Sequence, residues 1–189
     1  MKEIKPVSKF ILNKDDSILV IVDIQESLAN VMSERKKVVE NSLHLIEISK
    51  LLNIPVILTE QYPKGLGHTV NEIKEALPSY APLEKMTFDC CKGPAFLENI
   101  GNLKKKNIIL TGMETHVCIL QTCLSLLKNG YKVHLVKDAV CSRTKDNFIA
   151  GIEMMRDAGA VITCTETVLF QLLEKAGTEE FKAISKRIK

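Results

Sequence analysis

The amino-acid sequence predicts an α/β protein, a three-layer α-β-α sandwich around a six-stranded, mainly parallel sheet. Short apolar runs rich in β-branched residues alternate along the chain with longer segments in which apolar residues recur at helical spacing. Several of these short runs are almost continuously apolar, as in strands buried on both faces. Alternating strand and helix units favour a parallel sheet that is covered by helices on both faces.

Six runs supply the expected strands. The third run is the weakest, because it is short and contains several charged residues. In chain order they are "SILVIVD" (17–23), "IPVILTE" (54–60), "PLEKMTFD" (82–89), "NIILT" (107–111), "KVHLVKD" (132–138) and "AVITC" (160–164).

The segments between these strands have helical spacing and recognisable ends. A capping box starting at Thr69 begins one helix, Pro94 is expected in the first turn of the next, and Gly130 and Gly159 each end one. A long loop with Pro63 follows the second strand. The expected helices are 33–52, 69–77, a segment after Pro94, 117–129, 146–158, 167–176 and 179–188.

Composition narrows the class of protein. The 189 residues suit one domain, 1–189, and the 46% hydrophobic content is ordinary for a globular protein. A net charge of +3 is too small to favour a nucleic-acid partner, and no apolar stretch is long enough for a membrane partner. The N-terminus is too polar for a signal peptide, so the six cysteines are expected in a reducing compartment. These features predict a cytoplasmic enzyme.

Reactive side chains follow several of the expected strands. Asp23 ends the first, Glu60 ends the second, and Lys85 lies in or near the third. The segment Thr111 to Cys118 follows the fourth. Because ligands bind beyond the carboxyl ends of parallel strands, a carboxylate, an ammonium and a thiol can converge on one edge of the sheet.

Cys118 lies where the first turn of a helix is expected, and there the helix dipole and a neighbouring lysine would favour the thiolate. A nearby carboxylate could accept the thiol proton. Each residue also has a purely structural interpretation: Cys118 as a buried helix residue, Asp23 as a turn cap and Lys85 as a surface lysine. His116 either forms a Cys–His pair or lines a pocket.

Three separated segments carry a family resemblance: "VIVDIQESL" with Asp23 and Gln25, "EKMTFD" with Lys85, and "LTGMETHVCILQTCLSLLKNGY" with Cys118. The chain resembles the isochorismatase-like cysteine hydrolase superfamily, which includes nicotinamidases and N-carbamoylsarcosine amidohydrolase. "TEQYPKGLGHT", "DAVCSR" and "TETVLFQLL" are similar to its YcaC-like and isochorismatase-domain-containing branch. The resemblance implies a Rossmann-like, isochorismatase-like hydrolase fold.

The resemblance also implies roles for individual residues. Asp23 takes the thiol proton as general acid and base, Lys85 stabilises the charged pair, and Cys118 attacks a carbonyl carbon to form a thioester. Backbone N–H groups of Glu114 and Cys118 would bind the oxyanion. The peptide bond from Met113 to Glu114 would be cis.

This sequence departs from two branches of the superfamily. Isochorismatases lack the nucleophilic cysteine, so Cys118 argues against that activity. Nicotinamidases carry an Asp-x-His metal motif where this chain has Glu60-Gln61-Tyr62, so no metal and no cofactor is expected, and nicotinamide is disfavoured as substrate. Substrate-pocket candidates are Gln25, Glu60, Tyr62, Phe88, Thr115 and His116.

The favoured function is therefore a metal-free cysteine hydrolase acting on a small amide or related carbonyl compound. As in relatives of this kind, a homo-oligomer is expected. An alternative is a catalytically weak binding or interaction protein that retains the hydrolase fold. A thiol redox protein would need a resolving cysteine, and Cys123 is expected on another face of the helix.

Overall fold

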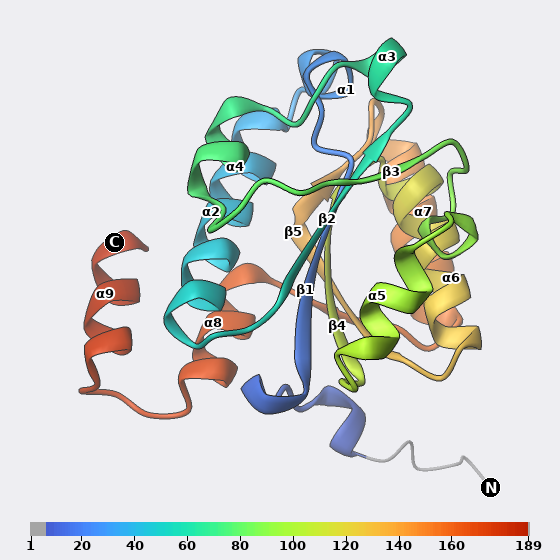
Figure 1. Cartoon of the computed structure of the whole chain (residues 1–189). Helices are drawn as coiled ribbons and strands as arrows, with labels where there is room; N and C mark the ends of the chain where they lie inside the picture. Colours follow the sequence, from blue (N-terminus) through green and yellow to red (C-terminus); the bar gives the residue numbers. More distant parts are fainter. Residues whose placement is uncertain (1–6, 189) are drawn as a thin grey trace, which may run out of the picture.

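The computed structural model describes residues 7–188, and its centre is a sheet of six parallel strands (Figure 1). The spatial order of the strands is β3-β2-β1-β4-β5-β6, which confirms the predicted six-stranded parallel sheet. The strands are β1 (Ser17–Val22), β2 (Val56–Gln61), β3 (Leu83–Lys85), β4 (Asn107–Met113), β5 (Lys132–Cys141) and β6 (Val161–Thr163).

Helices cover both faces of the sheet and complete the three layers (Figure 1). One layer contains α2 (Arg35–Leu51), α4 (Asn71–Ala76), α8 (Thr165–Leu173) and α9 (Glu179–Arg187). The other contains α5 (Phe96–Asn102), α6 (Leu120–Lys128) and α7 (Lys145–Asp157). Two short helices, α1 (Glu26–Asn30) and α3 (Pro63–Leu66), lie beyond the carboxyl ends of the strands. No helix within residues 7–188 is long and apolar enough to cross a membrane.

Strand β1 divides its side chains between two hydrophobic cores. Leu19 and Ile21 pack in the core beneath α2, whereas Ile18 and Val20 pack in the core beneath α5 and α6. All six residues of β1 are buried. This two-sided burial explains why its sequence is continuously apolar rather than alternating.

The chain leaves β1 on one side to form β2 and β3, and later returns on the other side as β4. The end of β1 therefore lies at the point where the strand order reverses, next to the end of β4. Gly112 in β4 has a φ of +129°, and a Cβ there would lie only 2.0 Å from the carbonyl oxygen of Val22. Glycine thus allows the two strand ends to approach each other directly below the candidate site.

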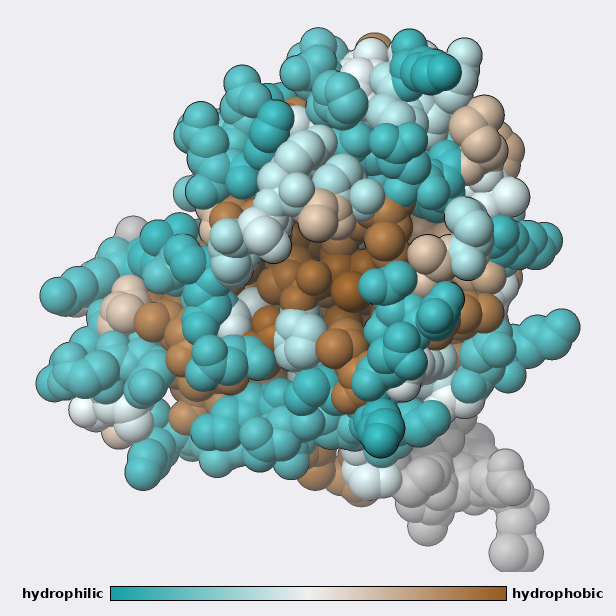
Figure 2. Space-filling view, viewed as in Figure 1, coloured by the Kyte–Doolittle hydropathy of each residue, from teal (hydrophilic) through white to brown (hydrophobic). Residues whose placement is uncertain are grey.

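Strand β3 pairs only with Thr59, Glu60 and Gln61, so the first half of β2 forms an edge of the sheet. Figure 2 shows apolar side chains gathered in this part of the surface, between the two helix layers. Pro55, Val56 and Leu77 are among the residues that line a hollow there.

At two helix starts, the residue predicted to begin the helix has a different role. Helix α4 begins at Asn71 with Val70 at its cap, and the Thr69 hydroxyl donates to Glu60 instead of capping the helix. The capping-box prediction is therefore wrong, because a buried carboxylate competes for the same hydroxyl. Pro94 precedes α5 rather than lying in its first turn, since Ala95 occupies the cap.

Candidate active site

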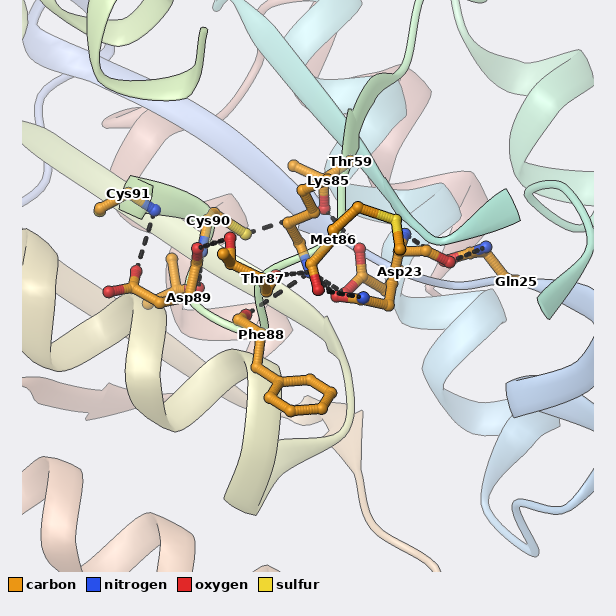
Figure 3. A network of polar contacts seen from close by, with 12 residues as sticks. Asp23, Gln25, Thr59, Lys85, Met86, Thr87, Phe88, Asp89, Cys90 and Cys91 are labelled. Carbon is orange, nitrogen blue, oxygen red and sulfur yellow. Dashed lines mark hydrogen bonds and ion pairs between the residues drawn. The ribbon is translucent and has the colours of Figure 1, made fainter. Parts of the chain in front are cut away.

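Asp23 follows β1 directly and is fully buried. Its φ of +52° lies in the left-handed region, which aspartate adopts more readily than most residues. The carboxylate accepts two hydrogen bonds, from Lys85 Nζ to Oδ2 at 2.6 Å and from Thr59 Oγ1 to Oδ1 at 2.7 Å (Figure 3). Both bonds satisfy carboxylate oxygens that would otherwise be buried without a partner.

Lys85 is the last residue of β3, and its side chain is only 3% exposed. Besides Asp23, its ammonium donates to Gln61 Oε1 at 2.9 Å and to the Thr87 carbonyl at 3.3 Å. Burial lowers the pKa of Lys85, but the charge of Asp23 and the nearby cysteines outweighs it, so the pKa is raised above its ordinary value. Lys85 is therefore held as a cation.

Cys118 lies in a π-helical turn, η4 (Thr115–Ile119), between β4 and α6. Such turns are rare and occur often at functional sites. The residue is buried, and its thiol lies close enough to Asp23 and Lys85 for both of their charges to affect its pKa. The side chains that follow β1, end β3 and lie in η4 thus form one cluster, as predicted for the ends of the strands.

The protonation of Cys118 differs from the expectation drawn from the helix dipole. Burial raises the pKa of the thiol, the Asp23 carboxylate raises it further, and Lys85 opposes them only in part. The thiol is therefore protonated at neutral pH. The sequence could not show this, because it does not reveal how deeply the thiol is buried.

The peptide bond between Met113 and Glu114 is cis, as the resemblance implied. The Glu114 side chain is buried, and its Oε1 pairs with Arg143 Nε at 2.9 Å. Its Oε2 lies 3.7 Å from His116 Nδ1 and has no hydrogen-bond partner within the described chain. His116 Nδ1 instead lies 3.0 Å from Ser142 Oγ, and no hydrogen bond joins the His116 ring to the Cys118 thiol within residues 7–188.

Helix α7 packs directly on η4. A Cβ at Gly151 would lie 3.1 Å from the Thr115 carbonyl oxygen and 3.1 Å from His116 Cα, so glycine permits this close contact. Thr115 is fully buried, and its hydroxyl has no partner among residues 7–188. The packing fixes the turn that carries Cys118.

Two of the pocket candidates serve the backbone or a loop. The Gln25 amide donates to the carbonyls of Gln61 at 3.0 Å and Gly67 at 2.7 Å, and accepts from the Gln61 N–H at 2.7 Å. Glu60 projects from the opposite face of β2 to Thr59 and Gln61. There its carboxylate accepts from the Thr69 N–H and hydroxyl, each at 2.7 Å, and from the Tyr80 hydroxyl.

Tyr62 and Phe88 are exposed, at 46% and 54%, and so is Met86 at 70%. The Tyr62 ring lies over Gly65, where a Cβ would be 2.3 Å from the ring. Figure 3 shows the Phe88 ring pointing away from the Lys85–Asp23 contact. Neither aromatic ring is therefore turned toward the cluster.

The sequence pattern that defines the isochorismatase domain matches residues 17–167, which include Asp23, Lys85 and Cys118. The chain belongs to the isochorismatase family. Residues 17–167 also contain all six strands of the sheet.

Relatives with curated names support the branch as well as the family. The secreted isochorismatase effector Isc1 of Phytophthora sojae is 41% identical over 92% of this chain and 84% of its own length. Isochorismatase domain-containing protein 2A of Mus musculus is 35% identical over 93% of this chain and 84% of its own length.

Solved structures of the family share the fold. The MAR1 ribonuclease of Caenorhabditis elegans has a TM-score of 0.87 and 38% identity, covering 94% of this chain and 92% of that one. YcaC of Pseudomonas aeruginosa, solved with hexane-2,5-diol and covalent acrylamide, has a TM-score of 0.87 and 28% identity, covering 94% and 91%. YcaC of Escherichia coli, an octameric hydrolase of unknown specificity, has a TM-score of 0.90 and 25% identity, covering 97% and 92%.

A metal, which the nicotinamidase branch of the family implies, does not fit the side chains at the end of β2. Glu60 already accepts hydrogen bonds from Thr69 and Tyr80, and His68 Nδ1 lies 3.1 Å from its Oε2. Residues 7–188 contain no group of three His, Cys, Asp or Glu side chains placed to hold an ion. The Glu60 carboxylate, which a metal would need as a ligand, instead fixes the loop after β2.

Sequence reasoning missed Thr59 and Gln61, which contact Asp23 and Lys85 directly. It also missed Cys90, a buried cysteine whose Sγ lies 3.9 Å from Thr59 Oγ1. The signal for the first two was available, because side chains two apart on a strand share a face. Thr59 and Gln61 point to one face of β2, whereas Glu60, which lies between them, points to the other. If Glu60 does not face the cluster, Thr59 and Gln61 do.

Proposed function

We propose that this isochorismatase-family chain is a metal-free cysteine hydrolase that cleaves a small amide or related carbonyl compound through a thioester on Cys118. The observation that carries the proposal is the buried ion pair between Lys85 and Asp23, at 2.6 Å, with the Cys118 thiol beside it. Removing two charges from water costs free energy, so a buried ion pair is weak evidence for stability alone. Beside a thiol, the same pair can stabilise charge during catalysis.

In the first half of the reaction, the Cys118 thiol gives its proton to the Asp23 carboxylate as sulfur forms a bond to the carbonyl carbon. The carbonyl π electrons move to oxygen, and the backbone N–H groups of Glu114 and Cys118 donate to this oxyanion. Collapse of the intermediate breaks the C–N bond. Asp23 returns the proton to the departing nitrogen, so an amine or ammonia leaves and a thioester remains.

In the second half, water attacks the thioester carbon while Asp23 takes a proton from it. The C–S bond then breaks, the carboxylic acid leaves, and the proton passes from Asp23 to the Cys118 sulfur. Lys85 keeps its charge throughout and stabilises whichever of the two partners is anionic. Thr59 and Gln61 fix the carboxylate and the ammonium through the hydrogen bonds at 2.7 and 2.9 Å.

Relatives support parts of this proposal. P. aeruginosa YcaC was solved with covalent acrylamide, an electrophilic amide, and a nucleophile at the position of Cys118 would account for such an adduct. The octamer of E. coli YcaC supports a homo-oligomer here too.

We further propose a single domain and a small-molecule partner rather than nucleic acid, although one relative is called a ribonuclease. Cytoplasmic location stays a prediction, since another relative is called secreted.

One observation favours the alternative, a binding protein that retains the fold but turns over slowly. The raised pKa of Cys118 leaves little thiolate in the free protein. A protein of this kind would bind amides near Cys118 without forming an acyl adduct.

In the deciding experiment, the protein is incubated with a panel of small primary amides and the release of ammonia is measured. The reaction is also quenched with acid, and the Cys118 peptide is examined by mass mapping. Ammonia release with an acyl group on Cys118, lost in Cys118→Ser and retained in Cys123→Ser, is the expected result. Amides that bind, as seen by protection against thermal unfolding, without any acyl group on Cys118 would replace the hydrolase proposal by the binding-protein function.

A further inference from the structure

A cavity of about 340 Å³ opens at the carboxyl end of β5, between the first turns of α2 and α7. Asp23, Lys85 and Cys118 are not among its lining residues. It lies on the same edge of the sheet as the candidate active site, but beyond β4 on the β5 side. Its size falls within the range of small-molecule sites.

The charged side chains around this cavity are mainly cationic. Of its two acidic residues, Asp138 is already engaged, because its Oδ1 accepts from the Thr165 N–H at 2.8 Å and the Thr165 hydroxyl at 3.0 Å. The other is Glu34. Four cationic side chains line the cavity: Lys37, Lys137, Arg143 and Lys145. None of the three lysines has an ion-pair or hydrogen-bond partner for its ammonium within the described residues.

Two further features favour an anion in this position. Arg143 uses its Nε to hold Glu114 at 2.9 Å, and the remaining guanidinium N–H groups have no partner among residues 7–188. The cavity also meets the N-terminus of α7, a helix of 13 residues capped by the Thr144 hydroxyl. A helix N-terminus adds a partial positive charge to those of the side chains.

The rest of the lining is apolar. Val38 and Val140 are buried, Phe148 is partly buried, and Ile149 is exposed. An inorganic anion would leave this apolar surface without a partner, whereas an organic anion could cover it. An extended nucleic acid would need cations along a stripe, and here they converge on one hollow.

We propose that this cavity is a second binding site, specific for a small organic anion with one carboxylate on an apolar or aromatic body. The carboxylate lies among Lys37, Lys137 and Arg143, and the apolar body packs on Phe148 and Val140. The site does not depend on the proposed hydrolase chemistry, because it shares no side chain with the Asp23, Lys85 and Cys118 cluster. Arg143 nevertheless connects it to Glu114, the neighbour of the cis peptide bond.

The test is a titration of the full chain with sodium benzoate at low ionic strength, followed by the backbone amide resonances in ¹H–¹⁵N spectra. Benzyl alcohol serves as the uncharged analogue. The variant Lys37→Gln/Lys137→Gln removes two exposed cations from the cavity, and Lys128→Gln/Lys132→Gln makes the same change in net charge away from it. All four lysines are exposed or partly exposed, so both variants are expected to fold.

We expect benzoate to shift the resonances of residues 143–149 and to bind on the order of tenfold more weakly to Lys37→Gln/Lys137→Gln, while the control variant binds as the wild type does. Added salt should weaken the binding. Equal binding of benzyl alcohol, equal losses in both variants, or shifts confined to other residues would overturn the site. So would a short ribo-oligonucleotide that displaces benzoate from these residues at lower concentration.

Discussion

Replacing Asp23 with asparagine should make Cys118 more reactive toward a simple alkylating agent while abolishing hydrolysis. The carboxylate is one of the groups that raise the pKa of the thiol, and Lys85 is the group that lowers it. Asparagine removes the negative charge but keeps the shape. The Lys85 ammonium keeps its contacts with Gln61 Oε1 at 2.9 Å and the Thr87 carbonyl at 3.3 Å, so it stays to stabilise a thiolate.

The expected increase in the alkylation rate follows from how strongly the Asp23 charge raises the pKa of the Cys118 thiol. A charged group this close shifts a pKa by roughly one to three units. Each unit raises the thiolate fraction at neutral pH about tenfold, while the nucleophilicity of each thiolate falls about threefold. The alkylation rate of Asp23→Asn at neutral pH should therefore exceed that of the wild type by roughly threefold to fortyfold.

The assay is the iodoacetamide reaction rate of Cys118 against pH, read by peptide mass mapping. Cys90 and Cys123 are fully buried, so their lack of labelling confirms that each variant is folded. Lys85→Gln is the matched opposite change, and it should slow the reaction and move its pH profile upward. If the Asp23→Asn protein is folded but its Cys118 is alkylated no faster than that of the wild type, the opposing effects assigned to the charges of Asp23 and Lys85 are refuted.

Three further predictions concern stability. Thr59→Val keeps the shape but removes the donor to Asp23 Oδ1 at 2.7 Å, and should lower the free energy of unfolding by about 1–3 kcal/mol in urea titrations. Glu60 has a lowered pKa despite its burial, because Tyr80 and Thr69 donate to it, so its stabilisation is present above the unfolded pKa and lost as pH falls. Glu60→Gln should therefore be less stable than the wild type at pH 7, and the gap should narrow as the pH falls below the ordinary glutamate pKa of about 4.3. Burial lowers the pKa of His134 to about 4, so the unfolded chain binds a proton below pH 6.5 that the folded chain does not. The wild type should lose about 2 kcal/mol between pH 7 and pH 5 by this route, and His134→Leu should lose correspondingly less in the same titrations.

The sequence predicted the strands well because burial on both faces leaves a continuous apolar run, as in β1. It missed the short helices α1 and α3, which are too short to show a period. It also ended β5 at Asp138, whereas the strand continues to Cys141 after a shift of register between Leu110 and Gly112 of β4. A shift of register depends on the neighbouring strand and leaves no local pattern.

The position of the candidate site could be predicted for a different reason. Parallel topology alone brings the ends of β1, β3 and β4 together, so the clustering of Asp23, Lys85 and Cys118 could be predicted without knowing any side-chain contact. Predicting which residues line the pocket requires those contacts. Gln25 came from the family resemblance and Glu60 from its position at a strand end, yet their hydrogen bonds go to the backbone or to the loop after β2. Catalytic roles for the first three residues stay predictions until a substrate is known.

The protonated resting state of Cys118 is compatible with the proposed chemistry, because one carboxylate produces both. Asp23 raises the pKa of the thiol by its charge, and the same charge makes it the natural acceptor of the thiol proton. Transfer becomes favourable only when sulfur bonds to a carbon whose developing oxyanion is stabilised by the N–H groups of Glu114 and Cys118. A compound that cannot place its carbonyl oxygen there meets a thiol rather than a thiolate. Selectivity for carbonyl substrates would then come from the coupling of proton transfer to attack, rather than from a thiolate that is present in advance.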